Sequence, residues 1–200
     1  MQTPMAIINS KMELLLQSQN LDDKQLKAVA DAYDASNRLS KLNKTLLLLA
    51  KIENRQFPES KIISPQLLIN NQLETLEGLI ESKAIKVVKQ FDDNVELFIN
   101  PYLAEILFAN LIKNAIRHNI KEGELIIQIS NTFICISNAG TELAMDKSLL
   151  FERFHKQSSS PESLGLGLSI VQKICEVYSY AVNYRFENNV HHFQIDFTRT

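Results

Sequence analysis

Apolar residues recur at helical spacing through the first 50 residues of the chain. Ile8, Met12 and Leu15 follow one another at steps of four and three residues, which places them on one face of a helix. After the polar residues 17–20, a second apolar stripe runs through residues 26–49. Because this stretch contains no glycine, long helices are favourable. The pattern predicts two antiparallel helices joined by a short turn.

A single helical hairpin of this length leaves an apolar face uncovered. Two copies can bury that face together as a four-helix bundle. We therefore expect residues 1–56 to form half of such a bundle and to make the protein a homodimer. Periodicity alone favours a generic coiled-coil hairpin over any particular function.

The rest of the chain alternates between helical and strand patterns, so we expect a second domain over residues 57–200. Helices are predicted over residues 64–83, 100–118 and 164–178. Strands are predicted in pairs, over residues 85–91 and 95–99, 124–130 and 132–137, and 181–186 and 191–197. The predicted fold class is α+β, with the helical hairpin followed by an α/β sandwich in which a mixed sheet of about five strands carries three helices on one face.

Composition narrows the range of functions. Hydrophobic residues make up 45% of the chain, charged residues 22%, and the net charge is -2. Because a basic excess is missing, we expect no nucleic-acid partner. The cysteines, Cys135 and Cys175, lie in apolar surroundings and are predicted to be buried, reduced thiols. The longest apolar run, residues 46–50, is too short to span a bilayer, so we expect a cytoplasmic chain.

Candidate chemistry begins on the predicted helix 100–118. Asn110 and Asn114 share one face at helical spacing, with Arg117 and His118 one step away. Amides that are partly buried need partners, and a hydrated Mg²⁺ carrying a triphosphate would suit them because the ion takes few protein ligands. Taken alone, an asparagine pair at this spacing is more often a solvated polar face.

Three further segments follow in order along the chain. Asn138 ends a predicted strand two residues before Gly140, where its side chain could pair with an amino-purine edge. Residues 150–156 predict a short helical plug anchored by phenylalanines. Gly165 and Gly167 precede an apolar helix and would let backbone N–H groups approach an anion. Each of the three segments also has a purely structural explanation. These are, in order, an ordinary strand-terminal turn, a small surface helix and a packed glycine turn.

Together, the four segments resemble the ATP-binding domain of the histidine kinases, in the superfamily of gyrase, Hsp90, histidine kinase and MutL. The resemblance covers essentially the whole chain. Residues 110–119 match the N box, 137–140 the first glycine box, 151–154 the F box, and 163–168 the second glycine box.

The resemblance implies roles at the phosphate end of a nucleotide. Asn114 would bind Mg²⁺, with Asn110 beside it on the phosphate side. Arg117 would meet phosphate, and Lys156 would be able to reach the γ-phosphate. The other nucleotide-binding residues implied near the phosphates are Gly165, Leu166, Gly167 and Leu168.

At the base end, the resemblance implies that His118 flanks the adenine, that Asn138 accepts from its amino group, and that Gly140 closes over the ring. The first glycine box normally carries aspartate where this chain has Asn138, and a neutral acceptor makes a weaker hydrogen bond. Ser163 stands where the second box often begins with glycine. The departure at Asn138 is read as tolerated, and Gly165 and Gly167, which need the close approach, are kept.

The N-terminus resembles the continuation of the family motif His-Glu-x-x-Thr-Pro. Thr3-Pro4 matches its last two residues, so the phospho-accepting histidine is expected just before Met1. Thr3 would then position water for dephosphorylating the partner. Composition alone would read Thr3-Pro4 as a helix cap and a first-turn proline.

The resemblance implies a sensor histidine kinase that uses ATP and Mg²⁺, phosphorylates its own histidine, and passes the phosphate to an aspartate on a response-regulator receiver domain. The parent protein would be anchored in the bacterial inner membrane through upstream segments, and the 200 residues would not autophosphorylate.

Two alternatives remain. One is another ATPase of the superfamily, which would need a glutamate base where Asn110 stands. The other is a degenerate scaffold that dimerises without binding ATP.

Overall fold

The computed structural model describes residues 2–18, 20–143, 146, 149–154 and 164–197. The chain forms two compact units, Met1–Ala50 and Lys51–Thr200. The predicted domain boundary at residue 56 lies close to the end of the second helix at Glu53 and stays a prediction.

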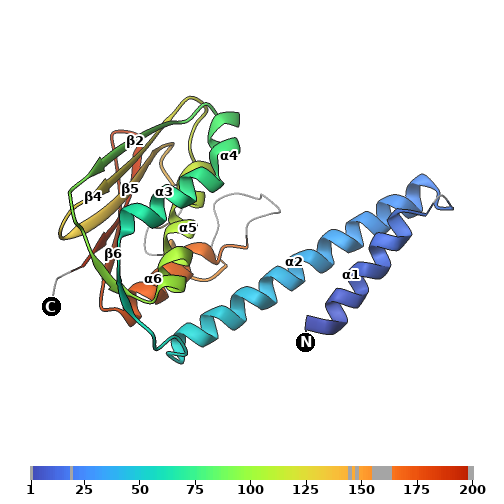
Figure 1. Ribbon diagram of the computed structural model, residues 1–200. Coiled ribbons are helices and arrows are strands. Elements are labelled where there is room, and N and C mark those ends of the chain that lie inside the picture. The colour runs from blue at the N-terminus through green and yellow to red at the C-terminus, as the bar shows by residue number, and fades with distance from the viewer. Residues whose placement is uncertain (1, 19, 144–145, 147–148, 155–163, 198–200) are drawn as a thin grey trace. The chain divides into compact units, whose positions relative to one another are not determined.

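The first unit is a helical hairpin (Figure 1), made by α1 (Gln2–Leu16) and the greater part of α2 (Asp23–Glu53). A capping box precedes α2, because the Gln25 amide donates to Asp22 Oδ1 at 2.8 Å and the Asp22 amide donates to Gln25 Oε1 at 3.1 Å. The predicted helices and the break between them are therefore confirmed.

Polar side chains join the two helices of the hairpin. Asn9 Nδ2 donates to Asn37 Oδ1 at 2.7 Å, and Ser36 Oγ donates to Asn9 Oδ1 at 2.5 Å. One turn further along α1, Tyr33 Oη donates to Glu13 Oε1 at 2.5 Å. Partners on α2 move backwards as α1 advances, so the helices run antiparallel.

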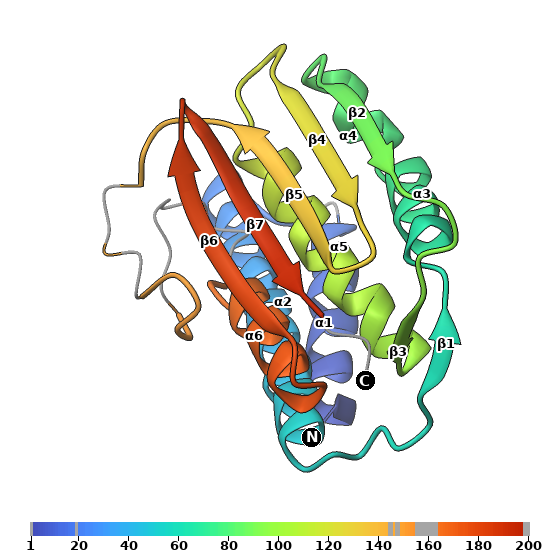
Figure 2. The same ribbon diagram turned by 90° about the vertical axis from the view of Figure 1, so that its left-hand side faces the viewer.

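The second unit is built on a mixed five-stranded sheet in the order β2-β4-β5-β7-β6. Its strands are β2 (Lys86–Phe91), β4 (Glu124–Ile129), β5 (Phe133–Ala139), β6 (Ala181–Glu187) and β7 (Val190–Asp196). β2 runs parallel to β4, and the other neighbours are antiparallel. Three helices cover one face of the sheet (Figure 2), namely α3 (Pro65–Thr75), α5 (Pro101–Arg117) and α6 (Gly167–Val177). The predicted α+β sandwich is confirmed.

The core lies between this sheet and these helices. Ile127, Ile136 and Phe193 are neighbours across β4, β5 and β7, and all are buried. One residue along, Gln128, Cys135 and Gln194 form a more polar row, as strand alternation requires. α5 packs between α3 and α6, and each buried leucine or isoleucine stabilises the fold by roughly 1.5–3 kcal/mol.

Two predicted elements differ from the structure. The helix expected over residues 64–83 breaks at Leu76 into α3 and α4 (Glu77–Ser82), beside Gly78, which is a weak helix former. The strands expected at 85–91 and 95–99 do not pair with each other. β2 pairs with β4, and β3 (Leu97–Ile99) pairs with β1 (Lys61–Ile63), a strand that the sequence pattern missed.

Candidate functional site

The polar face of α5 forms one wall of the candidate site. Asn110 and Asn114 lie one helical turn apart, and both are half-buried. Asn110 Nδ2 donates to Ile106 O at 2.8 Å, which turns the amide oxygen toward α6. A β-carbon at Gly167 would lie 2.9 Å from that oxygen. The structure therefore brings the first glycine of α6 against Asn110, so two of the predicted segments are neighbours.

The C-terminal end of α5 is held from outside the helix. Lys83 Nζ donates to the carbonyls of Ile116 at 3.0 Å and Arg117 at 2.7 Å. Burial lowers the pKa of Lys83, and the Arg117 charge lowers it further. His118 caps the helix, and its pKa is lowered by partial burial and then by Arg117. The basic end of α5 is thus fixed where His118 and Arg117 leave the helix.

The end of β5 places an amide in the core. Asn138 is 1% exposed, and its Oδ1 has no hydrogen-bond partner among the described residues. Its Nδ2 donates to Ala139 O at 3.0 Å. Two residues on, a β-carbon at Gly140 would lie 3.4 Å from the His118 carbonyl oxygen. The turn after β5 and the end of α5 are therefore neighbours.

The start of α6 combines a left-handed glycine with a close packing contact. Gly165 has φ 67°, which few other residues adopt, and its carbonyl accepts from the Phe154 amide at 2.9 Å. Leu166 is buried and precedes the helix, while Leu168 is half-buried in its first turn. Gly167 opens α6 beside Asn110. The predicted glycine-lined entry to a helix is present.

Not every predicted residue can be placed. Lys156 and Ser163 lie outside the described residues, and so does the Thr3 side chain. The plug expected over residues 150–156 is made of turns through Phe154 rather than a regular helix. Positive φ at Phe154, 67°, is incompatible with a continuous helix there.

Two residues near the site were missed by the sequence analysis. Lys83 closes α5, and His191 packs against Gly140, whose β-carbon would lie 2.5 Å from His191 Nε2. Strand alternation places His191 and Phe193 on the inner face of β7 and His192 on the outer face. That alternation was the one signal in the sequence that could have singled out His191.

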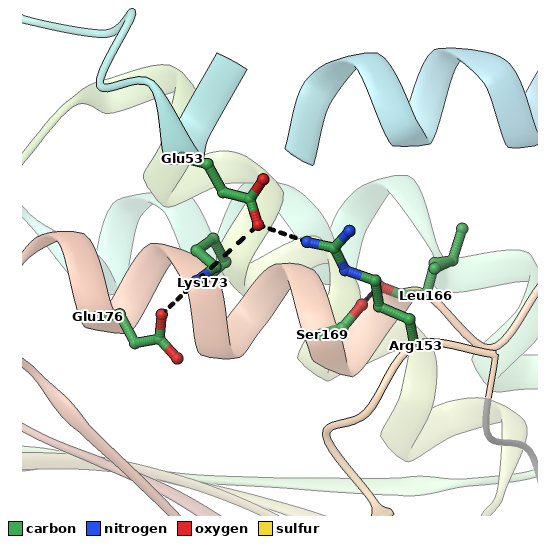
Figure 3. A network of polar contacts seen from close by, with 6 residues as sticks. All are labelled: Glu53, Arg153, Leu166, Ser169, Lys173 and Glu176. Carbon is green, nitrogen blue, oxygen red and sulfur yellow. Dashed lines mark hydrogen bonds and ion pairs between the residues drawn. The ribbon is translucent and has the colours of Figure 1, made fainter. Parts of the chain in front are cut away.

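A cluster of charged side chains joins α6, the loop that precedes it and the end of α2 (Figure 3). Glu53, in the last turn of α2, accepts from Arg153 and lies 3.9 Å from Lys173 Nζ. Lys173 also pairs with Glu176 at 2.6 Å. A depression of about 350 Å³ is lined by Phe151, Glu152, Arg153, Ser169, Gln172, Lys173 and Glu176. None of the predicted nucleotide-binding residues lines this depression, so we do not assign it to the nucleotide.

The described part of the chain contains no group of three or more His, Cys, Asp or Glu side chains placed to hold a metal. None of its helices combines the length and the apolar character needed to cross a bilayer.

Residues 100–197 match the family model of the histidine kinase-, DNA gyrase B- and HSP90-like ATPases. The second unit therefore carries an ATPase domain of this class. Over nearly its whole length the chain is similar in sequence to curated sensor proteins, among them a sensor histidine kinase.

Two curated relatives and one solved structure illustrate this relationship. The chain is 29% identical to the heme sensor protein HssS of Staphylococcus aureus (strain JH9), over 93% of this chain and 42% of that protein. It is 27% identical to the sensor histidine kinase HprS of Escherichia coli (strain K12), over 98% of this chain and 44% of that protein. The histidine kinase AdeS of Acinetobacter baumannii superposes with a TM-score of 0.69 at 20% identity, over 97% of this chain and 94% of that one. The chain thus spans less than half the length of these curated relatives.

Proposed function

We propose that this chain is the catalytic portion of a sensor histidine kinase, which binds Mg-ATP and provides the phosphoryl group for a histidine. The amide oxygen of Asn138, which is buried and has no partner among the described residues, is the observation that supports nucleotide binding most directly. Leaving such an atom without a partner costs about 1–3 kcal/mol, so a ligand that donates to it gains that amount back. The adenine amino group is such a donor.

The other predicted residues fit the phosphate end. Asn114 is half-buried, and within the described residues no hydrogen bond involves its side chain, so its amide oxygen is available to a cation. Asn110 lies one turn before it, next to Gly167. Mg²⁺, when bound, would neutralise phosphate charge while keeping most of its own waters, which suits a site with few carboxylates. The phosphates would be surrounded by Arg117, Lys156 and the backbone from Gly165 to Leu168.

The homologues support a two-component role. We infer that the acceptor histidine receives the γ-phosphoryl group and passes it to an aspartate on a response-regulator receiver domain, and that Thr3 orients water for the reverse hydrolysis. We also propose that the whole protein is anchored in the bacterial inner membrane through segments other than those described.

The hairpin supports homodimerisation. Its helices meet through polar contacts, whereas large apolar side chains face outward. The exposed ones are Ile7, Ile8, Leu14, Leu15, Leu26, Leu39, Leu46 and Leu47. A second copy can bury them.

Calorimetric titration of the chain with ATP, with and without Mg²⁺, tests nucleotide binding. We expect binding that Mg²⁺ strengthens. Asn138→Ala should weaken it by about 10-fold, because one hydrogen bond to a buried group is lost. Asn138→Asp is the matched variant and should bind at least as tightly as the wild type, because a charged acceptor is stronger. Absence of binding at millimolar ATP would favour the non-catalytic scaffold.

The histidines of the chain lie at positions 118, 155, 191 and 192, all in the second unit. None is on α1 or α2, where a phospho-accepting histidine of the hairpin would have to be. We therefore expect the chain to bind nucleotide without labelling itself. Incubation with γ-labelled ATP and Mg²⁺ tests this, and acid-labile label on the chain would contradict it.

A further inference from the structure

The turn that follows Asn138 packs against a histidine from the neighbouring strand. Asn138 and His191 are direct partners across the antiparallel pair of β5 and β7. Beyond them, the Gly140 amide donates to Asn189 O at 2.9 Å. Residues 139–141 therefore lie against the start of β7.

Gly140 has no room for a side chain, and the reason is this histidine. A β-carbon there would lie 2.5 Å from His191 Nε2 and 2.7 Å from His191 Cδ2. Such distances are too short for real atoms, so the ring would have to move. Among the described glycines, only Gly165 has a positive φ, so the backbone at Gly140 does not itself demand glycine. Glycine is needed at this position because the His191 ring occupies the space of a side chain.

The ring cannot move easily because it is buried and two neighbouring side chains hold it. His191 is 5% exposed. Its Nδ1 lies 2.8 Å from Tyr184 Oη, and its ring packs against Phe186 with centroids 4.8 Å apart. Burial raises the pKa of Tyr184 to about 12, so the phenol keeps its proton and can donate it to Nδ1. Burial lowers the pKa of His191, which favours the neutral ring.

A neutral ring that accepts at Nδ1 carries its proton on Nε2, the atom nearest Gly140. A backbone hydrogen bond with Thr141, in the same turn, raises the pKa of His191 and offsets part of the lowering by burial. Tyr184 thus selects the tautomer, and the tautomer directs a donor at the turn after Asn138.

We propose that His191, held by Tyr184, is a positioning residue that fixes residues 139–141 and thereby the Asn138 amide for nucleotide binding. The inference rests on the proposed function, because it assigns the base of the nucleotide to Asn138. His191 does not touch the nucleotide in this proposal; it acts through the turn.

The test compares ATP affinities of full-chain variants by calorimetry. His191→Ala should weaken binding about 10-fold, and Tyr184→Phe about 3-fold, which are the effects of losing hydrogen bonds of ordinary strength. His191→Gln should stay within about 3-fold of the wild type, because its amide supplies a donor and an acceptor. Gln194→Ala, on the opposite face of β7 and hydrogen-bonded to Asp196 in the same strand, is the control and should bind like the wild type.

A double-mutant cycle tests the steric part. Gly140→Ala should weaken ATP binding by at least about 10-fold, and adding His191→Ala should recover part of that loss, so that the two changes are not additive. The same cycle read by urea unfolding should show the recovery in stability. Tyr184→Phe and His191→Gln add no atoms to the core and keep the test decisive if Gly140→Ala does not fold.

The outcomes separate the two proposals. A wild-type chain that binds no ATP overturns the proposed function and the positioning role together. A wild-type chain that binds, with His191→Ala and Tyr184→Phe binding equally well, overturns the positioning role alone. Additive effects of Gly140→Ala and His191→Ala overturn the steric explanation for Gly140.

Discussion

At the scale of single residues, two buried amides have an oxygen without a partner among the described residues, those of Asn119 and Asn138. Asn119 lies between α5 and β4, and a β-carbon at Gly123 would approach its oxygen to 2.2 Å. That oxygen is therefore closed off by its own loop. Asn138 ends a strand beside the end of α5, and we propose that its oxygen accepts a hydrogen bond from the nucleotide.

A buried and a half-buried imidazole should make the fold sensitive to acid. Burial lowers the pKa of His191 and of His192 from the ordinary value of 6.5. Between the lowered value and about 6.5, the unfolded chain binds more protons than the folded one, so stability falls as the pH decreases through this range. Urea unfolding at pH 7.5 and 5.5 should give a smaller free energy of unfolding at pH 5.5. His191→Gln should reduce the difference, and equal stability at both pH values would contradict the prediction.

Residue types and spacing singled out Asn110, Asn138 and the glycines, and the resemblance to a family grouped them as a nucleotide site, which stays a prediction. They could not predict Lys83 or His191, because those side chains come from segments that meet the site only in the folded chain. Lys83 ends a helix that precedes α5, and His191 reaches Gly140 through the pairing of β5 and β7.

At the scale of elements, α5 is fixed at both ends. Asn100 Oδ1 accepts from the amides of Tyr102 at 3.0 Å and Leu103 at 3.2 Å. Pro101 takes the first-turn position, where a missing N–H costs little. At the other end, the Lys83 ammonium satisfies carbonyls that the helix leaves free.

Replacing Lys83 should therefore loosen the end of α5 that carries Arg117 and His118. Lys83→Met keeps the aliphatic stem and removes the charge, and we expect it to destabilise the domain by about 1 kcal/mol. It should also weaken ATP binding, whereas Lys83→Arg should retain most of both properties. Urea unfolding and calorimetry measure the two effects. Lys86→Met, at an exposed lysine paired with Glu124, is the control and should change neither by much.

The strand partners illustrate what a local pattern cannot determine. Residues 92–94 are good turn formers, so a hairpin between the flanking strands was a reasonable prediction. β2 instead pairs in parallel with β4, across the whole of α5, and β3 turns away to β1. The hairpins β4–β5 and β6–β7 were predicted correctly, because there the partner is the next strand along the chain.

At the scale of the whole molecule, the apolar face of the hairpin carries the prediction of a dimer. Leu14 and Leu39 are 58% and 54% exposed. Leu14→Glu with Leu39→Glu should convert the dimer to monomers in sedimentation equilibrium, because burying each leucine contributes about 1.5–3 kcal/mol.

Lys27→Glu, at an exposed polar position of α2, is the matched control and should leave the dimer intact. Helical content by circular dichroism should stay close to that of the wild type in all variants. A wild-type chain that sediments as a monomer, or a double variant that remains dimeric, would contradict the assignment of this face.

The whole-molecule organisation was largely predictable, because a long glycine-free helical stretch and a mixed α/β stretch differ in composition as well as in period. The acceptor histidine and the partners could be inferred only through the resemblance to a family. No periodicity encodes them.

The hydrogen bonds of Asn9 have a consequence for movement within the hairpin. Its amide donates to Asn37 and accepts from Ser36, so both its polar atoms are committed to one position along α2. Sliding α1 along α2 must break both bonds before new partners are reached, which makes intermediate positions costly. Any signal carried by these helices would therefore pass as a step between discrete registers. Asn9 would hold the two helices in one register until both of its hydrogen bonds break.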